Sequence, residues 1–200
     1  MGPICRLGAV AAKVVTGQLS QNPAVLPNGA RVVDPLLGAT PPTGRARVQA
    51  DAASRGLAIE LVHREAASSL EEAAALLGLP TRSIVKSLVV KRSDGDFLFA
   101  LVPGDRQISW PKLRAEVGVN RLRLPEAELA LAATGYERGT ITPLGSSTAW
   151  PVHADASIVG QRIAMGAGEH GYSLFVDADA LIASFGAIVG DITEPVRPPG

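Results

Sequence analysis

Cysteine, net charge and long hydrophobic runs are all lacking in this sequence, and each absence removes a class of function. The single cysteine, Cys5, cannot form an intramolecular disulfide, and it stands near a terminus with no catalytic partner beside it. The 19 Lys and Arg residues balance 19 Asp and Glu residues, so no overall field draws the protein to nucleic acid or to an anionic membrane. We therefore expect a reducing, cytoplasmic environment and only local contacts with any RNA.

No segment approaches the roughly 18 uninterrupted apolar residues of a membrane-spanning helix. The N-terminal stretch MGPICRLGAVAAKVV is broken by Gly8 and Lys13, so we expect neither a membrane anchor nor an export signal. A hydrophobic content of 46% in 200 residues is still enough to bury a sizeable core, and one main domain is expected.

Histidine is too scarce for an ordinary zinc site, since the chain has only His63, His153 and His170. His153 and Asp155 are two residues apart in PVHADAS and could place two ligands on one side of a strand, but no third ligand stands nearby. We interpret the histidines as surface residues or as buried residues with satisfied hydrogen bonds, and we expect no metal.

The stretch GAGEHG at residues 166–171 matches G-x-G-x-x-G, the pattern of a dinucleotide-binding loop. That loop opens a helix, whereas a strand pattern, YSLFV, follows at once here, so we predict a tight hairpin and no nucleotide cofactor. The sequence has no G-x-S-x-G nucleophile elbow, and nothing in it supports nucleophilic catalysis by a side chain. No cofactor of any kind is therefore expected.

Glycine and proline are concentrated at the N-terminus, where residues 1–44 hold 12 of them and show no sustained hydrophobic period. This composition indicates either a disordered extension or a start codon placed too far upstream. We expect one domain over residues 45–193 and a flexible tail over residues 194–200.

Within that domain, helical and strand patterns are interleaved with hairpin signals, which predicts an α+β fold with a mixed, mostly antiparallel sheet. Ser68 and Glu71 form a capping-box pattern, SDGD at 93–96 predicts a hairpin turn, Pro111 suits a first helical turn, and Asp177 or Asp179 can cap the last helix. The predicted helices cover residues 45–56, 70–78, 109–117, 126–133 and 177–185. The predicted strands cover residues 57–64, 83–90, 97–102, 121–124, 140–142, 151–154, 161–165, 172–176 and 187–192.

The strand SIVKSLVV, residues 83–90, has two largely apolar faces and carries a charged lysine at its middle. With the period of two, Lys86 shares a face with Ile84, Leu88 and Val90. A buried ammonium without a partner costs several kcal/mol or loses its proton. Two interpretations stay open: Lys86 reaches water from an edge strand, or it lies at the floor of a pocket that takes an anionic or carbonyl group.

A local basic cluster spans a helix and the strand after it, and it consists of Lys112, Arg114, Arg121 and Arg123. Such a cluster is either a solvated face or a site of phosphate contact.

Several ordered motifs carry a resemblance to a known family. They are the lysine in IVKSLVV, the stretch LVPGDRQI at 101–108, the G-x-x-x-P element from Gly139 to Pro143 within TGYERGTITPLG, the strand with Asp155, and GAGEHG followed by a strand. In these motifs, from about residue 45 to residue 192, the sequence resembles the YbaK/EbsC family of free-standing aminoacyl-tRNA deacylases, which are related to the editing domain of bacterial prolyl-tRNA synthetase.

The resemblance implies a sheet curled into a barrel-like core with surrounding helices, and a pocket for the aminoacyl group on the 3′ end of tRNA. It implies that Lys86 is the catalytic residue and that Gly139 and Pro143 line the same pocket. Cleavage of an activated ester needs orientation and stabilisation of an oxyanion, which a lysine and backbone N–H groups can supply. The attacking group is either water or, for a cysteinyl substrate, the thiol of the substrate itself.

Further residues are expected around this pocket. Gly145 and the loop with Gly166 and Gly168 shape it and offer N–H donors, while Asp155 fixes Lys86 or a substrate amine. Two positions depart from cysteine-specific members of the family, which carry threonine and an aromatic residue where this sequence has Ser87 and Arg64. Both are expected to contact the substrate, and the amino acid stays open among alanine, cysteine, serine and similarly small ones.

The expected function is trans-editing: hydrolysis of a small amino acid from a mischarged tRNA, with tRNA as the partner, prolyl-tRNA synthetase as a second candidate partner, and no membrane association. The basic cluster at 112–123 is the expected contact for the acceptor stem. The alternative is a non-catalytic module of the same fold that binds tRNA ends or docks on a synthetase.

Overall fold

The computed structural model describes residues 42–65 and 67–196, so residues 1–41 of the N-terminal extension predicted over residues 1–44 lie outside this range. The helices are α1 (Gly44–Ser54), α2 (Leu70–Leu77), α3 (Trp110–Val117), α4 (Ala127–Thr134) and α5 (Ala178–Phe185), with short 3₁₀ helices η1 (Thr81–Ser83) and η2 (Ala156–Ile158). The strands are β1 (Ile59–His63), β2 (Val85–Arg92), β3 (Phe97–Pro103), β4 (Arg106–Ile108), β5 (Leu122–Arg123), β6 (Val152–Asp155), β7 (Arg162–Gly166), β8 (Tyr172–Asp177), β9 (Ile188–Gly190) and β10 (Thr193–Pro195).

All five predicted helices are present, and two of their caps can be compared with the prediction. Asp177 caps α5 by accepting a hydrogen bond from the N–H of Ala180 at 2.8 Å. The box predicted for α2 is wrong by one residue. Ser69 is the cap and accepts from the N–H of Glu72 at 3.1 Å, while the Glu72 carboxylate accepts from the N–H of Ser68 at 2.7 Å. The sequence SSLEE offers two registers, and the later one gives Glu72 two donors from Ser68.

The predicted hairpin at 93–96 is confirmed. The N–H of Arg92 donates to the carbonyl of Asp96 at 2.8 Å, and Gly95 takes the left-handed conformation that the turn requires, with φ of 96°. From there β2 and β3 pair antiparallel without interruption, from Lys91 opposite Phe97 to Val85 opposite Pro103.

The strand predicted at 140–142 is wrong, because this segment forms a turn whose backbone bonds are local or reach the neighbouring hairpin. The N–H of Thr140 donates to the carbonyl of Glu137 at 3.0 Å, and the N–H of Gly168 donates to the carbonyl of Thr140 at 2.9 Å. Two short strands were not predicted as such: β4, and β10, which pairs with β4 and takes in Glu194 and Pro195 from the expected tail.

The strands form three sheets, with orders β5-β2-β3-β6-β9, β1-β8-β7 and β10-β4. The α+β class and the mixed, mostly antiparallel pairing are confirmed, since β6 pairs parallel with both β3 and β9 while the other pairs of named strands are antiparallel. The expected barrel-like core is not found as a closed barrel, because the strands of the described residues form separate sheets and no closed ring. Between the two larger sheets, one isolated bridge links Ile84 to Ala164.

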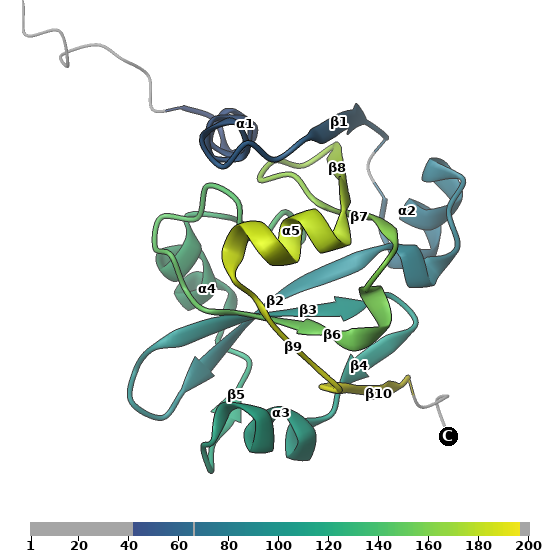
Figure 1. The fold of residues 1–200 in the computed structure, drawn as a ribbon. Helices are drawn as coiled ribbons and strands as arrows, with labels where there is room; N and C mark the ends of the chain where they lie inside the picture. Colours follow the sequence, from purple (N-terminus) through teal and green to yellow (C-terminus); the bar gives the residue numbers. More distant parts are fainter. Residues whose placement is uncertain (1–41, 66, 197–200) are drawn as a thin grey trace, which may run out of the picture. The chain divides into compact units, whose positions relative to one another are not determined.

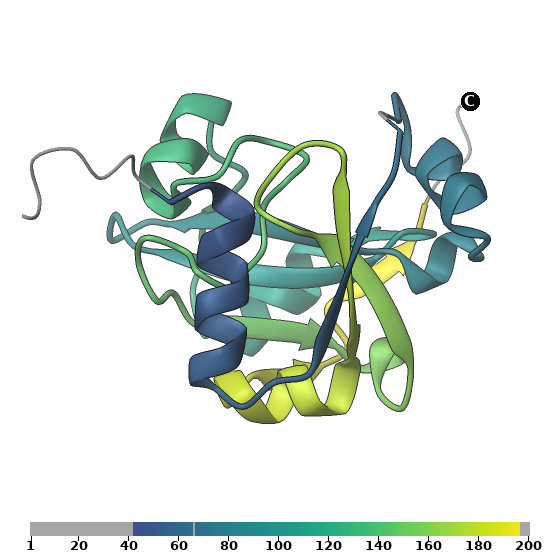
Figure 2. The ribbon, with the colours of Figure 1, turned by 90° about the horizontal axis from the view of Figure 1, so that it is seen from above.

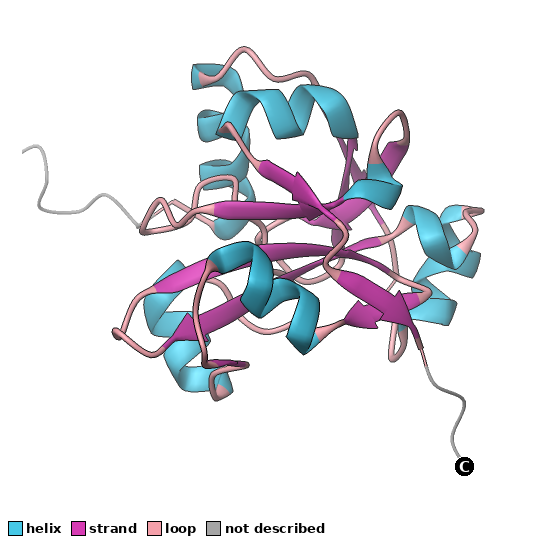
Figure 3. Ribbon diagram, turned by 60° about the horizontal axis from the view of Figure 1, so that its bottom comes forward, coloured by secondary structure: helices cyan, strands magenta, loops and turns pink. Residues whose placement is uncertain are grey.

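The five-stranded sheet separates two hydrophobic cores. One face, with Val85, Val89 and Phe99, packs against the three-stranded sheet and against α1, α4 and α5. The opposite face, with Val90 and Ala100, packs under α3 and the β4-β10 ribbon. Figure 1 shows α5 above the five-stranded sheet and α3 below it, and Figure 2 shows β1 and β8 crossing over its strands. In Figure 3 the helices lie around the strands.

The second core contains two polar side chains of β6. His153 is 4% exposed and its Nδ1 has no hydrogen-bond partner among the described residues, so the interpretation of a surface or satisfied histidine is wrong for this residue, whereas His63 and His170 are exposed. The reason is that β6 lies inside the five-stranded sheet, between β3 and β9, and a hydrophobic core packs on each face of that sheet. Burial lowers the pKa of the His153 imidazole.

Asp155 anchors the end of the described chain. Its carboxylate accepts hydrogen bonds from the hydroxyl of Thr193 at 2.6 Å, from the N–H of Ile192 at 3.3 Å and from Ser157. Burial by itself raises the pKa of Asp155, but the hydrogen bonds from Ser157 and Thr193 outweigh it and leave the pKa below its ordinary value. The ionised carboxylate therefore ties β10 to the central sheet.

Replacing Asp155 with asparagine should lower the free energy of unfolding by about 2 kcal/mol at neutral pH, because charge-assisted hydrogen bonds to a buried carboxylate are lost. Since the folded pKa lies below the unfolded one, the carboxylate's contribution is full above the unfolded pKa and is lost as the pH falls through the folded pKa. Urea unfolding at pH 7 and at stepwise lower pH should show a shallower acid dependence for Asp155→Asn. The control is Asp191→Asn, which removes an exposed ion pair with Lys112 and should change little. Equal losses in the two variants would contradict the anchor.

Candidate active site

A cavity of about 630 Å³ runs along β2. Its walls come from α2 and the segment before it, from both faces of β2, from the segment that leads into α4, from the turn after Tyr136, and from β7 and β8. Segments far apart in the sequence therefore meet here, and the strand with the central lysine lies at the middle of the cavity.

The edge of β2 that faces away from β3 is open over most of its length. Among the described strands, β5 pairs with it only at Lys91 and Arg92. In an antiparallel pair, alternate residues turn their N–H and C=O groups to the partner strand and to the opposite side. The N–H of Arg92 donates to the carbonyl of Asp96, on the β3 side. The N–H of Phe99, the partner of Val89 in β3, donates to the carbonyl of Pro151, on the side of β3 that faces away from β2. This alternation turns the backbone groups of Ser87 and Val89 toward the open edge, whereas those of Val85 lie beside the Ile84–Ala164 bridge to β7.

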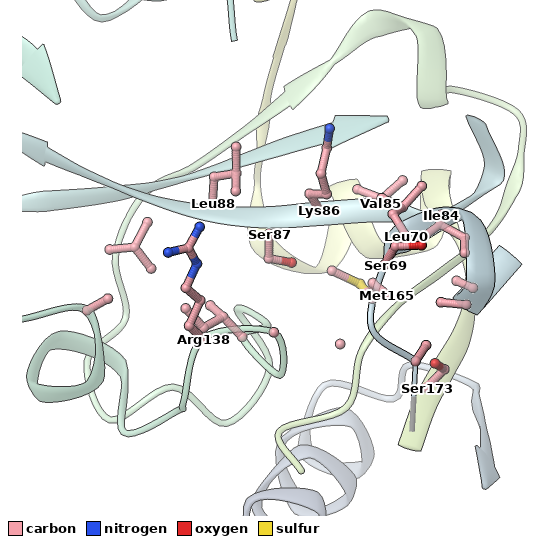
Figure 4. Close-up of a pocket in the computed structure, with 18 of the residues that line it drawn as sticks. Ser69, Leu70, Ile84, Val85, Lys86, Ser87, Leu88, Arg138, Met165 and Ser173 are labelled. Atoms are coloured by element: carbon pink, nitrogen blue, oxygen red, sulfur yellow. The ribbon is translucent and has the colours of Figure 1, made fainter. Parts of the chain in front are cut away.

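Ser87 is the polar side chain that points from β2 into the cavity. It is 8% exposed, and its hydroxyl has no hydrogen-bond partner among the residues that the structure describes. Figure 4 shows the hydroxyl on the same side of β2 as Met165 and Arg138. A buried hydroxyl left unpaired costs about 1–3 kcal/mol, so a ligand group that bonds to it would remove this cost.

Lys86 also lines the cavity, from the other side of the strand (Figure 4). Its ammonium donates to the carbonyl of Arg106 at 2.5 Å and to that of Gly104 at 3.3 Å. Burial lowers the pKa of the Lys86 ammonium, and the carboxylates of Asp105 and Glu71 oppose this shift. The ammonium therefore bonds to the β3–β4 turn and is only partly exposed, and whether Lys86 binds an anionic or carbonyl group stays a prediction.

Arg64 lies in the cavity wall beyond the end of β1. Its Nε donates to the hydroxyl of Ser173 at 3.0 Å, and one terminal nitrogen donates to the carbonyl of Glu65 at 3.0 Å. These bonds hold the guanidinium along the wall. Arg64 and Ser173 therefore form a polar rim opposite α2.

Two of the expected glycines line the cavity. Gly139 has φ of 93°, a conformation that side chains rarely adopt. Gly166 packs so closely on the turn that an added Cβ would lie 2.6 Å from the carbonyl oxygen of Ile141 and 2.7 Å from that of Thr140. The third, Gly168, is not among the lining residues; it supports the turn through its N–H and packs against Gly44.

Pro143 and Gly145 line a different cavity, of about 590 Å³, beside α1. The N–H of Gly145 donates to the Asp51 carboxylate at 2.8 Å, and its carbonyl accepts from Arg47 at 2.6 Å. Asp155 lines neither cavity and pairs with Thr193 instead of Lys86 or a substrate. The structure thus separates these three residues from the group around Ser87.

The basic cluster is divided in the same way. Lys112 donates to Asp191 at 2.8 Å and to the carbonyl of Thr193 at 3.0 Å, while Arg114 lies on α3. Arg123, in β5, directly precedes Leu124, which lines the cavity along β2. Arg121 and Arg123 are exposed and flank that wall.

Arg138 is a lining residue that the sequence did not single out. It directly precedes Gly139 of the G-x-x-x-P element, and that position is the signal that could have identified it. Its side chain rises from the turn toward β2 in Figure 4. Within residues 42–65 and 67–196, no group of three or more metal-ligating side chains is present, and no helix is long and apolar enough to cross a membrane.

Comparison with known proteins gives a consistent result. A family model described as an aminoacyl-tRNA editing domain matches residues 63–183. A solved structure titled "Crystal structure of a putative trans-editing enzyme for prolyl tRNA synthetase" is similar with a TM-score of 0.70 and 28% identity, covering 78% of this chain and 99% of that one.

The curated relatives are proline–tRNA ligases, and this chain is similar to a small part of each. The ligase of Thermosipho africanus is 42% identical over 88 residues, which is 44% of this chain and 16% of the ligase. The ligase of Sulfurihydrogenibium sp. is 30% identical over 131 residues, which is 64% of this chain and 23% of the ligase.

Replacing Gly166 with alanine should displace the turn at 139–142, because the added methyl meets backbone oxygens and not a flexible side chain. The amide resonances of this turn should shift, and hydrogen exchange at the N–H of Gly168 should accelerate, since its acceptor Thr140 moves. Gly160→Ala, whose Cβ meets nothing within 4 Å, is the control for a general effect of losing glycine. Unchanged exchange at Gly168 in Gly166→Ala would show that the close packing is not needed.

Proposed function

This chain belongs to the aminoacyl-tRNA editing domain family, and we propose that the cavity along β2 binds and hydrolyses the ester of a tRNA that carries a wrong, small amino acid. The observation that carries this proposal is the unpaired hydroxyl of Ser87 at the open edge of β2, within a wall of small or apolar residues that includes Ala164 and Met165. Such a wall accepts a short side chain, and one buried hydroxyl orients it.

Hydrolysis requires an attacking water and a donor for the oxyanion. Water adds to the ester carbonyl, the carbon–oxygen bond to the ribose then breaks, and the proton released by the water passes to the ribose oxygen. The N–H of Ser87 points to the open edge and is our proposed oxyanion donor, because a fixed backbone dipole stabilises the charge that develops there. The family supports hydrolysis, and nothing in the comparisons supports cyclisation by a substrate thiol.

Lys86 is our proposed catalytic cation, although part of its hydrogen-bonding capacity is already used within the protein. Its ammonium has three donors, and two of them bond to the carbonyls of Gly104 and Arg106. An ester bound on the Ser87 side of β2 would turn one of its oxygens toward the open edge of the strand, within reach of the third donor. Burial lowers the pKa of Lys86, which makes its ammonium a stronger hydrogen-bond donor to an ester oxygen.

The partner in this proposal is the 3′ end of tRNA, with Arg121 and Arg123 beside the cavity as contacts for the acceptor stem. Lys112 is a weaker candidate, since Asp191 already pairs with it. Prolyl-tRNA synthetase remains a proposed partner, in line with the similarity to a structure titled as its trans-editing enzyme. Alanine, cysteine and serine all remain candidate amino acids, because one methylene changes binding by only about 1–3 kcal/mol.

The two bonds that hold the Lys86 ammonium favour a second candidate function, a module of the same fold that binds tRNA ends through their phosphates, or docks on a synthetase, and cleaves no ester. The two functions differ in their response to the substrate. A module that contacts phosphates alone should bind charged and uncharged tRNA equally and lose affinity steeply with salt, whereas a pocket for the aminoacyl group should distinguish the two at both salt concentrations.

Deacylation of a panel of tRNAs charged with small amino acids should show cleavage of one or two of them by the wild type. Lys86→Ala should lower kcat/KM at least about tenfold, or 1.4 kcal/mol, while Lys91→Ala on the same strand, outside the cavity, should stay within about twofold. Circular dichroism at the assay temperature controls for loss of fold, because Lys86 also bonds to the β3–β4 turn. If nothing is cleaved, or if Lys86→Ala matches Lys91→Ala, the binding module is the better proposal.

A further inference from the structure

Arg138 is a cation of the cavity with no hydrogen bond or ion pair inside the part of the chain that the structure describes. The other two cations of the lining have partners: Arg64 bonds to Ser173 and Glu65, and Lys86 bonds to two carbonyls. A guanidinium presents five N–H donors in a planar fork. Arg138 therefore holds the largest set of unused donors in this site.

The turn that carries Arg138 is held on both sides. The N–H and the hydroxyl of Thr140 donate to the carbonyl of Glu137 at 3.0 and 2.9 Å, and the Glu137 carboxylate lies 3.0 Å from Nε2 of His170 in the β7–β8 hairpin. Gly166 packs against the same turn. The backbone under Arg138 is thus fixed, and its side chain points toward β2 in Figure 4.

Ser87 and Arg138 lie at different depths in the cavity, and this difference indicates how a substrate would be oriented. Ser87 is 8% exposed and lies at the floor, whereas Arg138 is exposed and lies at the mouth. In an aminoacylated tRNA the ester is neutral and the amino group is positive, so neither suits an unpaired guanidinium. The anionic groups next to the ester are the phosphodiesters of the last nucleotides, and a planar fork binds phosphate oxygens in pairs.

We propose that Arg138 binds the phosphodiester between the last two nucleotides of the tRNA and so positions the ester over Ser87. This inference rests on the proposed function and adds to it a residue and the substrate group that it recognises. Arg138 acts in binding and positioning, because it contacts the phosphate and not the reacting carbonyl.

The test uses two small alanyl esters in place of tRNA: one on the 3′ oxygen of adenosine, which has no phosphate, and one on the dinucleotide cytidylyl-adenosine, which has the phosphodiester. In the wild type, kcat/KM should be at least about tenfold higher for the dinucleotide, which corresponds to about 1.4 kcal/mol. Arg138→Ala should abolish this difference and leave the adenosine ester within about twofold of wild type. Arg138→Lys keeps the charge without the fork and should restore the difference only in part.

The matched control is Arg162→Ala, which removes an arginine from outside the cavity, where it pairs with Glu60 and is 64% exposed. It should preserve the difference between the two esters. An equal loss on both esters in Arg138→Ala would overturn the proposal in favour of a structural role, and an unchanged difference would overturn it outright.

A binding measurement tests the role of Arg138 even if the proposed hydrolysis does not occur. If the wild type cleaves neither ester, equilibrium binding of uncharged cytidylyl-adenosine and of adenosine decides the role of Arg138 without any reaction. Tighter binding of the dinucleotide by the wild type, lost in Arg138→Ala and kept in Arg162→Ala, supports the phosphate site. Equal binding of the two probes by the wild type overturns it.

Discussion

The open edge of β2 is the constraint on which the rest of the site depends. In an antiparallel pair, only alternate residues of a strand bond to the neighbouring strand through their N–H and C=O groups. The N–H and C=O groups of the remaining residues need another partner. In β2 these groups belong to Ser87 and Val89, because the Ile84–Ala164 bridge covers one end of the edge and β5 reaches it only farther along, at Lys91. A cavity with fixed backbone donors results, and a substrate that lies along the edge can complete the hydrogen bonding.

The two faces of the same strand carry different chemistry. The Ser87 side opens onto apolar walls and an unpaired hydroxyl, which suits recognition of a small side chain. The opposite face holds the charged and polar groups of the second core, where Lys86 bonds to carbonyls and Asp155 bonds to Thr193. A buried charge is tolerated only with such partners, so this face has fewer free donors for a ligand than its residue types suggest.

Close packing between two loops supports the cavity. The turn at 139–142 and the hairpin at 166–171 approach so closely that only glycine fits at Gly166, and the Glu137–His170 pair joins them near the surface. The turn lies outside the named strands, whereas the hairpin continues β7 and β8. The cavity wall thus depends on backbone contact between segments that are distant in the sequence, and Arg138 is presented from that wall.

The sequence by itself determined the local elements and the family. Hydrophobic period, caps and turn residues predicted the five helices, the SDGD hairpin and the placement of Lys86 between two apolar faces, because these features depend on neighbouring residues. Tertiary structure alone decided which motifs share a cavity. Ser87, Gly139, Gly166 and Arg138 line the cavity along β2. Pro143 and Gly145 line the cavity beside α1, and Asp155 lines neither. These placements depend on strand order and on contacts between loops that are distant in the sequence. Neither can be predicted from the spacing of residues along the chain.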